Sequence, residues 1–152
     1  MKNVVLCMFL VLLTHVVAVG ADQDSRFVRK IQFPGAREFV VVAEGDFEPR
    51  SIGSYSVRIY SGVNPEFPID DYAAGIIRQR DGTVEDVKFY DVDSDSAQEL
   101  IVIMRSVGSG GYLSADAFDY GNKSLKLLLS VSGLEAKADP ILALIKKLKK
   151  GL

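Results

Sequence analysis

The sequence predicts an all-β protein, an antiparallel β-sandwich of about eight strands with a short C-terminal helix. Short runs of alternating apolar and polar residues recur at roughly ten- to fifteen-residue spacing, with turn residues between them. A helical pattern appears only near the C-terminus. Strands at this spacing favour a sandwich or closed barrel over a layered arrangement of alternating strands and helices.

The chain begins with a segment typical of a secretory signal peptide. Lys2 supplies a positive charge, an apolar run covers residues 4–19, and small residues at 18–21 suit cleavage. The run is shorter than the ~20 residues that span a membrane, so a permanent anchor is the weaker interpretation. We therefore expect residues 1–21 to be removed on export and residues 22–152 to form a single domain.

The mature chain would lack the side chains on which many enzymes depend. Its single cysteine, Cys7, and its single histidine, His15, both lie in the signal segment. Disulfides, zinc sites built on Cys or His, and Ser-His or Cys-His pairs are thereby excluded. A hydrolase with two carboxyl groups stays open, but neighbours such as Asp70 and Asp71 point apart. We expect a protein that is not an enzyme and that needs no cofactor.

The charge is nearly balanced, with 18 basic and 20 acidic residues and a net charge of −2. Nucleic-acid binding favours a basic face, so we expect no nucleic-acid partner.

Five strands are expected between residues 26 and 92. The first is followed by a turn at Pro34-Gly35, and a Pro-rich acidic loop covers 63–72. Asp81-Gly82 is a strong two-residue hairpin signal between the fourth and fifth strands. The expected strands are 26–33, 39–43, 53–62, 73–80 and 84–92.

Three further strands are expected at 99–106, 112–120 and 124–132. The first of them, ELIVIMRS, is apolar on both faces, which is typical of a central strand in a sheet covered on both sides. Tyr120-Gly121-Asn122-Lys123 predicts a tight hairpin between the other two.

The C-terminal stretch DPILALIKKLKKGL predicts a helix. Asp139 suits the N-cap and Pro140 the first helical position, and an apolar stripe follows at helical spacing. The helix either packs on the sandwich with its lysines solvated or lies on a membrane surface. We favour packing, because a helix this short binds bilayers weakly, and we expect no stable membrane anchor.

An acidic stretch, DVDSDSAQEL, resembles the calcium loops of EF-hands and of integrin-like propeller repeats. Asp91, Asp93, Asp95 and Glu99 supply carboxylates that can converge on a hard cation. However, Ser96 stands where a glycine usually follows, the glutamate comes early, and no helices flank the loop. We expect no metal, and we keep a calcium-stabilised binding or adhesion module as the alternative function.

The stretch SVGSGGYLSADAF contains the second candidate site, Ser109-Gly110-Gly111-Tyr112. Glycines allow positive φ angles and close approach of the backbone to another surface. The two hydroxyl groups donate and accept hydrogen bonds, and a tyrosine ring is a frequent interface anchor. Such a neutral, narrow tip is suited to entering a cleft. The other interpretation is an ordinary glycine-rich hairpin whose tyrosine packs on its own sheet.

This SGGY loop, in its context RSVGSGGYLSADAF, resembles that of the periplasmic inhibitors of invertebrate-type lysozyme from Gram-negative bacteria. The signal peptide, the cysteine-free strand-rich body and the acidic stretch support the resemblance. It implies a periplasmic β-sandwich that forms a homodimer and inserts the loop into the active-site cleft of lysozyme. Ser109 and Tyr112 would be the inserting side chains, and Gly110 and Gly111 would shape the tip.

The chemistry of a lysozyme cleft agrees with this implication. Two catalytic carboxyl groups flank the scissile bond, and the hydroxyls of Ser109 and Tyr112 can donate hydrogen bonds to them. Arg105 can add a charge-assisted contact to the enzyme, or it can pair with a cross-strand partner in its own sheet. We therefore expect an inhibitor of lysozyme, with the invertebrate-type enzyme as its partner.

Overall fold

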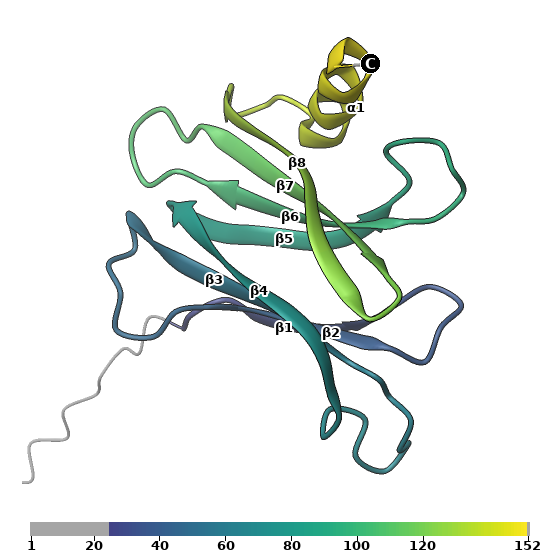
Figure 1. Cartoon of the computed structure of the whole chain (residues 1–152). Coiled ribbons are helices and arrows are strands. Elements are labelled where there is room, and N and C mark those ends of the chain that lie inside the picture. Colours follow the sequence, from purple (N-terminus) through teal and green to yellow (C-terminus); the bar gives the residue numbers. More distant parts are fainter. Residues whose placement is uncertain (1–24, 152) are drawn as a thin grey trace, which may run out of the picture.

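The computed structural model describes residues 25–151, which form two four-stranded antiparallel sheets packed face to face and one helix (Figure 1). The first sheet has the order β1-β2-β3-β4 and the second the order β5-β6-β7-β8. The predicted sandwich of about eight strands is confirmed, whereas the predicted signal peptide lies outside the described residues. The elements are β1 (Val28–Gln32), β2 (Phe39–Glu44), β3 (Ile52–Tyr60), β4 (Tyr72–Asp81), β5 (Thr83–Tyr90), β6 (Glu99–Arg105), β7 (Leu113–Gly121), β8 (Ser124–Leu134) and α1 (Pro140–Gly151).

The core fills the space between the sheets. Alternate residues of each strand point inward, so Tyr55, Val57 and Ile59 of β3 are all buried, as the alternation predicts. They pack against inward residues of the opposite sheet, including Leu100, Val102, Met104 and Phe118.

Helix α1 covers the outer face of the second sheet, as Figure 1 shows. Leu144 is fully buried in a second apolar cluster with Ile101 and Ile103 of β6. Strand β6 is therefore buried on both faces, which explains its continuous apolar run.

The interpretation of the helix as one that packs on the sandwich is confirmed. Asp139 Oδ1 accepts hydrogen bonds from the N–H groups of Ile141 (2.9 Å) and Leu142 (3.3 Å), which makes it the N-cap. The membrane-surface interpretation is not favoured, because Ile141, Leu144 and Ile145 of the apolar stripe pack against the sheet. Between residues 25 and 151, no helix has the length and apolar character needed to cross a membrane.

Two of the three predicted turns are confirmed. Gly35 follows Pro34 between β1 and β2 with a φ of 70°. Asn122 (φ 51°) and Lys123 (φ 56°) form the two-residue turn of the β7–β8 hairpin, with the left-handed conformation that this turn type requires.

The predicted hairpin at Asp81-Gly82 is wrong. Strand β4 pairs with β3, and β5 pairs with β6, so the chain changes sheets at Gly82. The N–H of Gly82 donates to the carbonyl of Ser51 (2.8 Å), a strand end in the first sheet. The dipeptide correctly marks a sharp reversal of the backbone, but it does not determine whether the strands on either side pair with each other.

A buried polar contact between Tyr55 and Asp116 links the two sheets. The phenol of Tyr55 on β3 donates to Asp116 Oδ2 on β7, which also accepts from Arg78 Nε (3.3 Å). Burial, followed by the neighbouring Asp116 charge, raises the pKa of Tyr55, so its hydroxyl remains a donor.

We predict that Tyr55→Phe destabilises the fold, because Asp116 is left buried with one hydrogen bond fewer. The expected loss is ~1–3 kcal/mol in the free energy of unfolding, measured by urea denaturation. Tyr60→Phe on the same strand is the control, since the Tyr60 hydroxyl makes no hydrogen bond to the described residues. Equal midpoints for the two variants would contradict the role of the Tyr55–Asp116 contact.

Candidate functional site

The β6–β7 loop (residues 106–112) projects from one end of the sandwich. Figure 1 shows it as the green loop beside the point where β4 passes into β5. The N–H of Ser106 donates to the carbonyl of Tyr112 (2.9 Å), which closes the base of the loop. Inside it, the N–H of Gly111 donates to the carbonyl of Gly108 (3.2 Å), and Gly111 has a φ of 51°. The loop is therefore a closed, locally hydrogen-bonded turn.

The four predicted site residues lie together in this loop, with Tyr112 at its base and its ring folded over Gly110. Ser109 and Gly110 are exposed, and Tyr112 is 54% exposed. The Tyr112 ring lies directly over Gly110, where a Cβ atom would come within 2.4 Å of ring atom Cε2. Tyr112 belongs to neither core cluster, so its ring rests on its own loop and presents a face to solvent.

Arg105 holds the base of the loop. Its guanidinium forms a two-point ion pair with Glu85 on the neighbouring strand β5, through Nε and through Nη2 (2.9 Å to Oε1). Its Nη1 donates to the carbonyls of Gly111 (2.9 Å) and Ala136 (3.1 Å). The hydrogen bonds to Glu85 raise the pKa of Arg105. The sequence left two roles open for Arg105, a contact to the enzyme and a pair across strands. Its contacts in the structure are those of the cross-strand pair, and they also position the loop.

Gly82 supports the loop from behind. Its φ is 88°, and a Cβ atom there would lie 1.9 Å from the carbonyl oxygen of Arg105 and 2.5 Å from the Cα of Ser106. Only glycine fits this contact without moving the start of the loop.

Arg80 is a structural residue that the sequence analysis missed. It is almost completely buried, yet it lies in a strand where alternation alone gives no reason for a charge to turn inward. Its guanidinium donates to the carbonyls of Ser54 (3.0 Å), Arg50 (3.0 Å), Pro49 (3.1 Å) and Gly82. The signal that could have found it is the nearby stretch GDFEPRS, whose backbone carbonyls need donors once the loop is folded.

The acidic loop (residues 91–98) lies at the other end of the sandwich. Carboxylate oxygens of Asp91, Asp93 and Glu99 come within 4.8 Å of one another, whereas Asp95 is outside this group. The loop's own backbone uses these carboxylates: Asp91 accepts from Ser94 (2.7 Å) and Ser96 (3.1 Å), Asp93 from Asp95 (3.1 Å) and Glu99 from Val92 (2.7 Å). These contacts describe an acidic turn whose carboxylates accept hydrogen bonds from its own backbone. They do not favour the calcium module.

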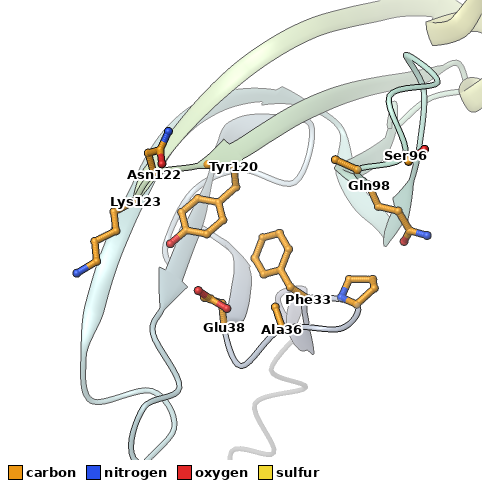
Figure 2. A pocket seen from close by; sticks show the side chains of 11 residues that line it. Phe33, Ala36, Glu38, Ser96, Gln98, Tyr120, Asn122 and Lys123 are labelled. Carbon is orange, nitrogen blue, oxygen red and sulfur yellow. The ribbon is translucent and has the colours of Figure 1, made fainter.

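A hollow in the described structure also lies away from the β6–β7 loop. It has a volume of about 590 Å³ and is bounded by Phe33, Glu38, Tyr120 and Lys123, with Ser96 and Gln98 of the β5–β6 segment on another side (Figure 2). Residues 106–112 do not line it. The candidate site is therefore a protrusion, and a protrusion binds by entering the surface of a partner.

The raised pKa of Glu99 makes the stability of the protein depend on pH, and this dependence can be measured. Burial and the charges of Asp93 and Asp95 raise the pKa of Glu99. The Glu99 carboxyl group therefore binds its proton more tightly in the folded protein than in the unfolded chain. The Glu99 contribution to stability therefore falls as the pH rises from below its ordinary value of ~4.3 to the raised value.

We predict that Glu99→Gln removes this part of the pH dependence while keeping an acceptor for the Val92 N–H. The melting temperature, measured from about pH 4 to pH 7, should fall with pH more in the original protein than in Glu99→Gln. Glu135→Gln, at an exposed site, is the control. A melting temperature that added calcium raises in the original protein and not in Glu99→Gln would revive the calcium alternative.

Comparison with known proteins shows the family and the fold to which the chain is similar. The model of a family described as the periplasmic lysozyme inhibitor of I-type lysozyme matches residues 25–148. The crystal structure of such an inhibitor from Aeromonas hydrophila is 44% identical, with 78% of this chain and 98% of that chain covered and a TM-score of 0.73. The A. hydrophila inhibitor in complex with Meretrix lusoria lysozyme is 45% identical, with 78% and 94% covered and a TM-score of 0.72.

No curated protein sequence matches the chain. The family model covers most of the residues, and the solved structures share the sandwich over nearly their whole length. The resemblance noted for the SGGY loop is thereby confirmed at the level of the family, whose members are periplasmic inhibitors and not enzymes. The chain belongs to the family of periplasmic lysozyme inhibitors of I-type lysozyme.

Proposed function

We propose that this inhibitor blocks an I-type lysozyme by inserting Ser109, Gly110, Gly111 and Tyr112 into the catalytic cleft. The observation that carries the proposal is the half-exposed Tyr112 ring, which lies over Gly110 in a hydrogen-bonded, neutral loop. The partner is proposed from the related A. hydrophila inhibitor, which was solved with the lysozyme of Meretrix lusoria.

The chemistry of the loop suits a cleft that holds two carboxyl groups. The hydroxyls of Ser109 and Tyr112 are donors, and neither makes a hydrogen bond to the described residues. Each can therefore donate to a catalytic carboxyl group without first breaking an internal contact. The tip has no charge of its own, so only polar groups that can be satisfied in the cleft are desolvated.

Preorganisation of the loop favours tight binding. The Ser106–Tyr112 hydrogen bond, the Arg105–Gly111 contact and the Gly82 support restrict the loop before the enzyme is met. Binding then orders few additional backbone angles and side chains, and the entropy lost on association is smaller.

Two further parts of the proposal rest on other grounds: the signal peptide on the N-terminal sequence pattern, and the homodimer on the family resemblance. Residues 1–21 direct export to the periplasm and are removed, which mass spectrometry of the exported protein tests. The mature chain forms a homodimer, which sedimentation equilibrium tests.

We predict that Tyr112→Ala weakens inhibition of an I-type lysozyme at least about thirtyfold, because truncation of a central aromatic anchor typically costs ~2 kcal/mol or more. Tyr112→Phe, which removes only the hydroxyl, should lose about tenfold. Inhibition constants are measured from the lysis of a cell-wall suspension. Tyr90→Ala, at an exposed tyrosine on the far end of the sandwich, should change nothing. Unaltered inhibition by Tyr112→Ala would contradict the proposed role of the loop.

Gly110 and Gly108 provide a matched pair within the loop. A Cβ atom at Gly110 collides with the Tyr112 ring, whereas a Cβ atom at Gly108 meets nothing within 4 Å. We predict that Gly110→Ala displaces the ring and weakens inhibition much more than Gly108→Ala does. The ring position in the free variants is followed by the Tyr112 NMR shifts. Equal losses of inhibition with an unmoved ring would show that Gly110 does not position Tyr112.

A further inference from the structure

The β2–β3 loop (residues 45–51) carries an unusual aromatic residue. Phe47 is fully exposed, at 104% of its reference area, and it makes no ring contact or hydrogen bond with the described residues. Its φ is 62°, a left-handed conformation that is rare and unfavourable for a bulky side chain. A strained backbone angle and a fully hydrated apolar ring are both unfavourable for folding, so packing within this chain gives no reason for Phe47.

The loop holds this conformation because its neighbouring residue turns inward. Glu48 accepts hydrogen bonds from the N–H (2.5 Å) and Oγ (2.7 Å) of Ser54 and lies 3.5 Å from Arg80 Nη2. Its carboxylate occupies the space left by two glycines, where Cβ atoms of Gly45 and Gly53 would come within 2.5 and 2.3 Å of it. With Glu48 fixed beneath the loop, Phe47 is directed out to solvent.

The buried Arg80 fixes the rest of the loop. It donates to the carbonyls of Pro49 (3.1 Å) and Arg50 (3.0 Å), directly after Glu48. Phe47 is therefore an exposed aromatic ring on a supported backbone, which is the state expected of an interface anchor and not of a flexible loop tip.

The β2–β3 loop and the β6–β7 loop share one support. Ser51, at the end of the first loop, accepts the N–H of Gly82 (2.8 Å), and Gly82 packs against Arg105 and Ser106 at the start of the second. Figure 1 shows both loops at the same end of the sandwich, on either side of the β4–β5 connection. A partner that surrounds the β6–β7 loop consequently faces the β2–β3 loop as well.

We propose that Phe47 is a second anchor for the I-type lysozyme, binding an apolar depression on the rim of the catalytic cleft while Tyr112 enters the cleft itself. The inference rests on the proposed function of the β6–β7 loop. A stable interface involves roughly 20–30 residues on each side, far more than residues 106–112 supply. The contact must extend onto neighbouring segments, and Phe47 is the exposed aromatic residue of the adjoining loop.

The test uses Phe47→Asn and Phe47→Gly in the full mature protein. Asparagine and glycine adopt positive φ readily, so both variants should fold with an equal or higher melting temperature than the original. Both should bind I-type lysozyme about tenfold more weakly by surface plasmon resonance, mainly through faster dissociation. Phe67→Ala, at an exposed phenylalanine in the β3–β4 loop on the far end, is the control and should bind normally.

A lower affinity together with an undiminished melting temperature supports the second anchor. Substitution of a residue needed only for folding would instead lower the melting temperature. Unchanged affinity overturns the proposal, and so does a change confined to the oligomeric state, which would make Phe47 a contact between two copies of this chain. Tyr112→Ala is measured in parallel. If it alone loses affinity, the proposed function stands and the Phe47 inference fails; if it retains affinity, loop insertion fails, whatever Phe47 does.

Discussion

The architecture at the end of the sandwich that carries the β6–β7 loop depends on one tight contact, that between Gly82 and the backbone of Arg105 and Ser106. The chain passes from the first sheet to the second through this single residue, whose φ of 88° and missing side chain let the two sheets meet. Two buried charged residues hold the connection: Arg80 donates to the Gly82 carbonyl, and Glu44 accepts the N–H of Val84 (2.6 Å). Buried charges are tolerated only when they are fully hydrogen-bonded, and here the loop backbones supply the partners.

This connection determines which loops lie together at one end of the sandwich. The sandwich core gives a rigid base, the sheet change brings the β2–β3 and β6–β7 loops to one end, and Arg105 fixes the base of the second loop. The hydroxyl groups of Ser109 and Tyr112 make no hydrogen bond to the residues that the structure describes, so they can meet polar groups of a partner. The protein therefore presents a preformed protrusion, which is the geometric complement of a substrate cleft.

The sequence predicts the parts of the molecule that arise from local pattern. Alternation in β3, the apolar run of β6, the Asn122-Lys123 turn and the Asp139 cap all have short-range causes, and the structure has each of them. The sequence also marked the SGGY segment as a loop between two strands, but its chemistry alone left open whether Tyr112 packs on its own sheet or faces solvent. The roles of Gly82 and Arg80 could not be predicted from the sequence. That of Gly82 depends on which strands pair, and that of Arg80 depends on carbonyl groups that converge from distant segments. In the sequence, Phe47 is an ordinary apolar residue. Only its φ angle and its full exposure in the structure distinguish it.

The central claim is that the β6–β7 loop occupies the same space in the lysozyme cleft as the glycan substrate. Steady-state kinetics of an I-type lysozyme on a soluble cell-wall oligosaccharide, at several inhibitor concentrations, tests it most directly. Shared occupancy predicts competitive inhibition, in which the apparent KM rises with inhibitor concentration and kcat stays constant. A fall in kcat with an unchanged KM would place the inhibitor outside the cleft and contradict the account.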